Sequence, residues 1–215
     1  MSARIERYKE YRRQGQELNQ KLVDSLSDDE LMEAARFLNM TKQQGGEEVL
    51  YHEGELDMAV QSDFAIHEIE RDEMALLDQF YQAERWNNET QREILEALRE
   101  TYTSLFEVTD VSRDERMLEF QDILAQDESH LSLTDINMSR TADPGALIFF
   151  RPVRFDDMTI TSGFMFPFES AYKDHLISVY QKVIDKTESR TESDKRFYIF
   201  YRMYKKYGST AFVRS

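Results

Sequence analysis

The residues best suited to chemistry in this sequence are Asp63, His67 and Glu70, which are separated by four and then three positions. In a helix these spacings place all three side chains on one face. Carboxylate and imidazole groups bind zinc or iron when a second segment adds ligands, and His52 and Glu53 are candidates for that segment. The triplet therefore predicts a metal-binding protein or metal-dependent enzyme. A solvated acidic helix gives the same spacing without any metal, and the triplet matches neither the Glu-x-x-His nor the His-Glu-x-x-His motif.

A second candidate site is the basic and aromatic segment from Lys195 to Tyr207. Cations beside aromatic rings can neutralise phosphates and stack on bases, as in proteins that bind single-stranded nucleic acid. The cations that would bind the nucleic acid are Arg196, Arg202, Lys205 and Lys206. The alternative is that the rings form a docking face on the protein core. Helical spacing places four of them on one stripe, namely Phe197, Phe200, Tyr201 and Tyr204. We favour the docking face, because an acidic chain repels nucleic acid.

Other catalytic motifs are absent from the sequence. Without cysteine there is no thiol nucleophile, no Gly-x-Ser-x-Gly motif occurs, and Gly45-Gly46 lacks the Gly-Lys-Ser/Thr of a phosphate-binding loop. No motif in the sequence indicates a cofactor. The sequence favours a protein that is not an enzyme.

The segments before residue 104 have helical patterns. Ser27 and Glu30 have the spacing of a capping box, which predicts a helix from Asp28 that ends before Gly45-Gly46. A long apolar stripe from Glu55 to about Trp86 predicts one continuous helix, which would carry the Asp63 triplet. Asn88 is a candidate cap for the next helix.

Residues 104–168 instead have the pattern of five short strands. Apolar and polar residues alternate, for example over Met117 to Leu124, and a continuous apolar run follows Asp143-Pro144-Gly145. Gly145 suits a turn position with positive φ, and Gly163 suits a bulge or sharp bend. This segment predicts a small five-stranded β-barrel or a curled antiparallel sheet.

The same segment resembles a small β module of uncharacterised bacterial proteins, some of which carry a metal-binding tail. The residues that carry the resemblance are Asp122-Ile123-Leu124 at a strand end, Ser139 before the glycine turn, and Arg151 at the end of a strand. The resemblance covers about a third of the chain and implies no activity. The chain departs from the pattern in having no cysteine.

Together these patterns predict an α+β protein. A helical region spans residues 1–103, the β module spans 104–168, and two helices over 169–215 pack on the β module. The helices of 169–215 are expected around Tyr172 to Val183 and around the ring stripe. We expect the three segments to form one integrated unit.

Charge and composition limit the partners. The formal net charge is −15, and residues 27–103 alone contain 20 acidic and 6 basic residues. Such a field favours basic partners and disfavours nucleic acid and anionic membranes, although it also serves solubility or salt adaptation. The lack of cysteine and of an apolar signal segment predicts a cytoplasmic protein. The leading hypothesis is a non-enzymatic interaction or regulatory protein with a protein partner. The sequence leaves the oligomeric state open.

Overall fold

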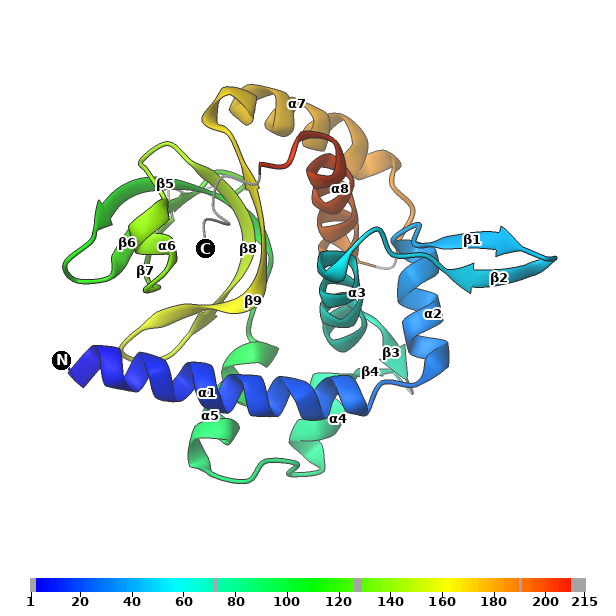
Figure 1. Ribbon diagram of the computed structural model, residues 1–215, viewed down its shortest axis with the longest axis horizontal. Coiled ribbons are helices and arrows are strands. Elements are labelled where there is room, and N and C mark those ends of the chain that lie inside the picture. Colours follow the sequence, from blue (N-terminus) through cyan, green and yellow to red (C-terminus); the bar gives the residue numbers. More distant parts are fainter. Residues whose placement is uncertain (1–2, 72, 126–128, 190, 210–215) are drawn as a thin grey trace. The chain divides into compact units, whose positions relative to one another are not determined.

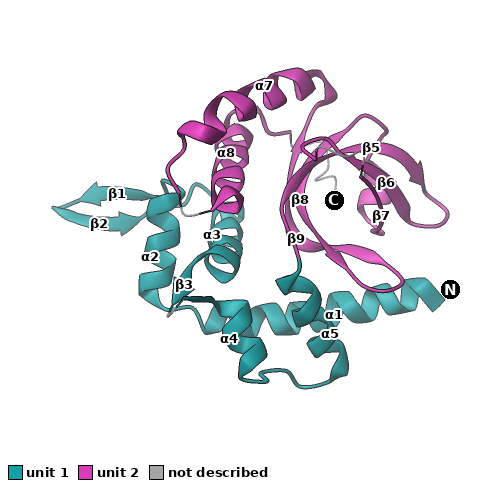
Figure 2. Ribbon diagram, turned by 180° about the vertical axis from the view of Figure 1, so that it is seen from behind, with its two compact units in different colours: residues 1–100 teal, residues 101–215 magenta. Residues whose placement is uncertain are grey.

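A computed structural model describes residues 3–71, 73–125, 129–189 and 191–209. The chain divides into two compact units, unit 1 over residues 1–100 and unit 2 over residues 101–215 (Figure 2). The predicted β module and the two C-terminal helices belong to the same unit.

Unit 1 is mainly helical and contains two β-hairpins (Figure 1). Its helices are α1 (Ala3–Asp24), α2 (Asp28–Phe37), α3 (Glu55–Glu68), α4 (Leu76–Gln82) and α5 (Glu89–Arg99). The hairpins are β1 (Thr41–Gln44) with β2 (Glu47–Leu50), and β3 (Glu70–Arg71) with β4 (Met74–Ala75).

The two predicted helix starts are confirmed. The Ser27 side chain accepts a hydrogen bond from the Glu30 N–H, and the Glu30 carboxylate accepts one from the Ser27 N–H, which completes the capping box. The Asn88 side chain accepts from the Gln91 N–H at the start of α5. These caps satisfy N–H groups that the first helical turn leaves without partners.

The prediction of one long helix after Glu55 is wrong. The backbone leaves the helix at Ile69, which is extended (φ −85°, ψ 125°), and Glu73 adopts a left-handed conformation (φ 63°) before α4 begins. The intervening hairpin is anchored elsewhere in unit 1, because Arg71 forms an ion pair with the buried carboxylate of Glu30. The end of α3, which the apolar pattern around it does not indicate, is thus accompanied by an ion pair between residues that lie far apart in the sequence.

Gly45 and Gly46 also have a different role from the predicted one. Helix α2 ends at Phe37, and the two glycines, with φ of 65° and 90°, form the tip of the β1–β2 hairpin. Positive φ at both central positions is the requirement of the commonest two-residue hairpin turn. The hairpin projects beyond α2 within unit 1 (Figure 1).

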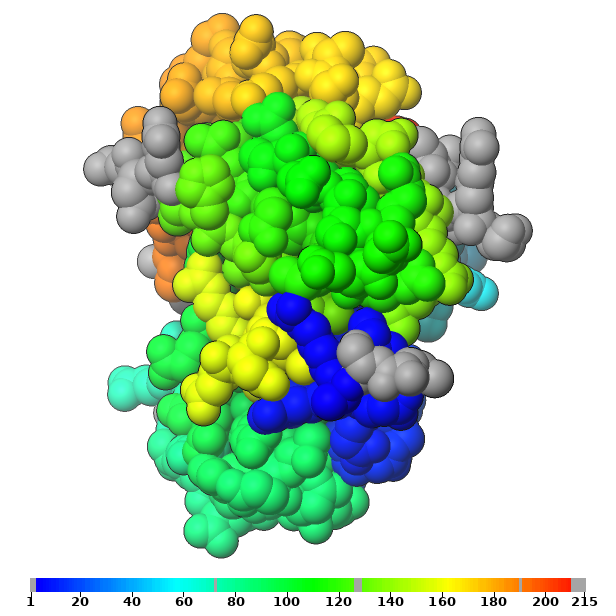
Figure 3. All heavy atoms as spheres, turned by 90° about the vertical axis from the view of Figure 1, so that its left-hand side faces the viewer, coloured from blue at the N-terminus to red at the C-terminus, as the bar shows by residue number. Residues whose placement is uncertain are grey.

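Unit 2 is built on a five-stranded antiparallel sheet with strand order β7-β6-β5-β8-β9. Its strands are β5 (Ser104–Ser112), β6 (Met117–Asp122), β7 (His130–Thr134), β8 (Leu147–Arg154) and β9 (Thr159–Phe168). One face buries a cluster that includes Phe106, Phe120 and Phe150, and the short helix α6 (Met138–Thr141) adds Met138 to it. In Figure 3 the residues of the β5–β6 hairpin, in green, lie in the middle of the face of unit 2 that is turned to the viewer.

The sheet is curled but open, so the alternative of a closed barrel is wrong. Within the described residues β7 and β9 are its two edges, and no ladder of hydrogen bonds joins them. The predicted roles of the two glycines hold. Gly145 has φ 87° in a turn closed by Ala146 N–H donating to Asp143 O, and Gly163 has φ 147° where the β8–β9 register shifts.

Helix α8 (Glu192–Tyr207) packs on the second face of the sheet through its ring stripe, which confirms the docking face. Phe197 and Phe200 are fully buried and Tyr201 is 3% exposed. The Phe200 ring stacks on Phe149 of β8 with centroids 4.5 Å apart, and Tyr204 stacks on Phe166 of β9 at 4.9 Å. Helix α7 (Lys173–Val183) precedes α8, with the 3-10 turns η1 (Ser170–Tyr172) and η2 (Ile184–Lys186) on either side of it.

The fold is therefore a mixture of helices and an antiparallel sheet, as predicted, although the number and lengths of the helices differ. Helix α8 is capped by the Thr191 hydroxyl, which accepts from the Asp194 N–H.

Candidate functional site

The three predicted metal ligands are not on one helix. Asp63 and His67 lie on α3, where Asp63 Oδ1 is 3.9 Å from His67 Nε2 and both side chains are largely buried. Glu70 lies beyond the end of α3, in β3, and is exposed. Among the described residues, no group of three or more histidine or acidic side chains is arranged to hold a metal ion. The one-face geometry predicted for the triplet is wrong, because α3 ends before its third member.

The segment that was expected to add metal ligands, His52 and Glu53, forms hydrogen bonds with α3. His52 Nε2 is 2.7 Å from Gln61 Oε1 of α3, and since an amide oxygen only accepts, the histidine nitrogen is the donor. The Glu53 N–H donates to Asp57 Oδ2 at 2.8 Å. These two bonds attach the loop after β2 to the first two turns of α3.

The four predicted nucleic-acid contacts divide into two groups. Arg202, Lys205 and Lys206 are exposed on α8. Arg196 is half-buried, and its guanidinium donates to Thr103 O at 2.9 Å and to Tyr180 at 3.4 Å. Three of the four rings of the stripe, Phe197, Phe200 and Tyr201, are buried against the sheet and are not exposed for stacking on bases.

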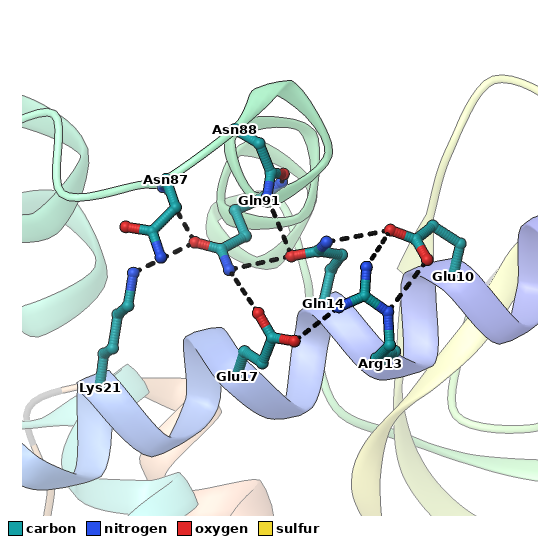
Figure 4. A network of polar contacts seen from close by, with 8 residues as sticks. All are labelled: Glu10, Arg13, Gln14, Glu17, Lys21, Asn87, Asn88 and Gln91. Atoms are coloured by element: carbon teal, nitrogen blue, oxygen red, sulfur yellow. Dashed lines mark hydrogen bonds and ion pairs between the residues drawn. The ribbon is translucent and has the colours of Figure 1, made fainter.

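A buried polar seam joins α1 to α5 and was not predicted (Figure 4). Gln91 is fully buried, and its amide donates to Gln14 Oε1 at 3.0 Å while its oxygen accepts from Lys21 and from the Asn87 N–H. Glu10 accepts from the Gln14 amide at 2.9 Å. Each buried amide is satisfied, so we assign the seam a structural role in aligning the two helices.

The clearest surface feature of unit 1 is apolar. Among the residues that the structure describes, the large hydrophobic side chains that are exposed are Leu50 (41%), Tyr51 (43%) and Met58 (56%). We call these three residues the 50–58 patch. The His52–Gln61 bond holds the segment after β2 against α3, the helix that carries Met58. Lys42 of β1 lies over one face of the Tyr51 ring, with Nζ 4.0 Å from its centroid.

The 50–58 patch lies in an acidic segment of the chain. Residues 47–58 contain five carboxylates and no lysine or arginine. Glu48 is neutralised by Arg36, whose Nε donates at 2.7 Å, and this hydrogen bond lowers the pKa of Glu48. Glu47, Glu53 and Glu55, in the same segment, are exposed.

Within the described residues, no helix is long and apolar enough to cross a membrane.

Comparison with known proteins gives a family without an activity. Neither the curated proteins nor the solved structures gave a match to this chain. A family model matches residues 2–214, nearly the whole chain. The protein therefore belongs to the family of unknown function DUF7986.

Proposed function

We propose that this protein is a non-enzymatic interaction protein whose 50–58 patch binds a basic protein partner. The observation that carries the proposal is that the exposed large hydrophobic side chains among the described residues, Leu50, Tyr51 and Met58, all come from one short segment of unit 1, between the end of β2 and the first turn of α3. Scattered single apolar residues are normal on a surface, whereas a group with a polar rim marks an interaction site.

The chemistry around the patch defines the partner. Glu47, Glu53 and Glu55, which are exposed, are neighbours of the apolar residues in the sequence. A complementary surface presents apolar anchors flanked by lysine or arginine, as the apolar face of a basic amphipathic helix does. Three anchors make a small interface, so we expect transient binding whose association rate falls as salt is added.

The test is selection of binding peptides from a random display library with the full chain as bait. We expect a consensus of apolar residues interspersed with lysine and arginine. In a subsequent binding assay, Leu50→Ser combined with Met58→Ser should weaken the selected peptides by about tenfold or more. An acidic consensus, or peptides that bind both proteins equally, would overturn the proposal.

Charge reversal supplies a matched control. Glu53→Lys with Glu55→Lys should weaken the selected peptides and flatten their salt dependence. Asp114→Lys with Glu115→Lys makes the same change in charge at an exposed turn of unit 2 and should have little effect. Equal effects of the two pairs would show that overall charge, and not the patch, governs binding.

Two parts of the proposal rest on sequence alone. We infer a cytoplasmic location from the lack of cysteine. The resemblance of residues 104–168 to a bacterial β module stays a prediction and assigns no activity to this chain.

A further inference from the structure

Unit 2 contains a polar pocket of about 340 Å³ that the proposed interaction does not use. It is lined from four separate elements: the start of β5, the end of β6, the end of β8 and the start of α8. Its principal polar side chains are Tyr102, Ser104, Asp122, Ser129, Arg154 and Arg196. A pocket of this volume is within the range that accommodates small molecules.

The carboxylate of Asp122 lines the pocket and is buried. Asp122 is 4% exposed, and its Oδ1 accepts from the Ser104 hydroxyl at 2.5 Å and from the N–H groups of Leu124 and Ala125 at 3.1 and 3.2 Å. Three donors on one oxygen offset the cost of burying the charge. The carboxylate therefore serves as an anchor for its neighbours.

Tyr102 interacts with both Asp122 and the first arginine, Arg154. Burial raises the pKa of Tyr102, and the negative charge of Asp122 raises it further, so the phenol keeps its proton at neutral pH. The Tyr102 hydroxyl accepts from Arg154 Nη2 at 3.3 Å, and the Arg154 guanidinium carbon lies 5.6 Å from the centroid of the ring. Arg154 lines the pocket and is exposed, and among the described residues it forms no ion pair with a carboxylate.

The second arginine is held in place by the protein. Arg196 Nη1 donates to Thr103 O at 2.9 Å and Nη2 to Glu192 at 3.0 Å. Burial alone would lower the pKa of Arg196, but its hydrogen bonds to Tyr180 and Glu192 raise it overall. The Glu192 side chain is 69% exposed, so solvent screens its charge. Since a guanidinium has five N–H groups, two remain after the three bonds to Thr103, Tyr180 and Glu192.

We propose that this pocket binds a small molecule through an oxyanion, a phosphate or a carboxylate, which Arg154 and Arg196 hold between them. Two guanidinium groups line a pocket whose one carboxylate, Asp122, already accepts three hydrogen bonds on Oδ1. Planar guanidinium forks match the oxygen spacing of both anions. The Ser129 side chain and the Tyr102 ring are available to the rest of the ligand.

The test is an NMR titration of the full chain with inorganic phosphate and, separately, with acetate, at constant ionic strength. We expect saturable shifts of the Nε–H signals of Arg154 and Arg196 with at least one anion, and the comparison identifies which oxyanion the pocket prefers. Arg154→Gln should weaken binding by about tenfold or more, and Arg154→Lys, which keeps the charge but not the fork, by less.

Arg113→Gln is the matched control, because it removes an exposed arginine from another turn of unit 2. It should leave the anion affinity unchanged. Shifts that do not saturate with either anion, or equal losses from Arg154→Gln and Arg113→Gln, would overturn the assignment. Arg154 is itself exposed, so its replacement is not expected to unfold the protein.

Discussion

Replacing Phe200 with alanine tests how α8 is attached to the sheet. The ring is 0% exposed, stacks on Phe149 at 4.5 Å and lies 5.6 Å from Tyr180 and 6.4 Å from Phe168. Removing a buried phenylalanine costs about 3–5 kcal/mol, a sum that includes the loss of ring pairs worth about 0.5–1.5 kcal/mol each. A typical domain is stable by only about 5–15 kcal/mol, so Phe200→Ala should come close to unfolding unit 2.

The assay must report on unit 2. The single tryptophan, Trp86, lies in unit 1, so its fluorescence follows the other unit. Hydrogen exchange of peptides from β8 and β9 measures the free energy of opening directly beneath the ring. Arg202→Ala on the exposed face of α8 is the control and should change that free energy by no more than about 0.5 kcal/mol.

A loss below about 1 kcal/mol for Phe200→Ala would refute the docking face, because a ring that costs so little to remove is not packed as described. If the wild-type chain then bound single-stranded nucleic acid with a steep dependence on salt, the role of α8 would have to be reassigned to that binding.

Three further predictions concern single residues. Gly145→Val should destabilise unit 2 by about 1 kcal/mol or more in urea unfolding, since valine resists φ 87°; an unchanged midpoint would remove the turn assignment. Ser27→Ala should cost unit 1 about 0.5–2 kcal/mol by Trp86 fluorescence, because it removes half of the capping box; no loss would mean that Glu30 alone suffices. The third is that Tyr102, whose pKa is raised from an ordinary 10.0, favours the folded state at all pH values below 10 and loses this contribution as pH rises through its higher folded pKa. The wild-type chain should therefore lose more stability than Tyr102→Phe in alkaline unfolding, and parallel profiles would contradict the burial of the phenol.

The strands of unit 2 and the caps of unit 1 could be predicted because their causes are local. Alternation over β6, the turn residue Gly145 and the pair Ser27–Glu30 each act within a few positions of the chain. The end of α3 could not be predicted in this way, because it coincides with an ion pair between Arg71 and Glu30, which lie far apart in sequence.

The two proposed binding sites could not be predicted from the sequence, and the reasons differ. The pocket draws Tyr102, Asp122, Arg154 and Arg196 from four elements, and no spacing in the chain relates them. The 50–58 patch consists of residues that would ordinarily be assigned to a core, and only the fold shows that they are exposed. The only one of these residues singled out beforehand for binding, Arg196, was expected at a surface for nucleic acid, and instead lines the pocket.

The two irregularities of the sheet set different rules for how its length can change in evolution. In β5 the ladder to β6 skips the single residue Thr109, so both Thr109 and Asp110 are exposed and Val111 returns to the core. In β9, Thr161 pairs with Pro152 and Met165 with Phe150, so the strand gains two residues over β8 around Gly163. Because a gain of two keeps the inward and outward alternation, deleting both extra residues would preserve the packing of α8. Deleting only one would leave a one-residue bulge of the kind that β5 already accommodates at Thr109.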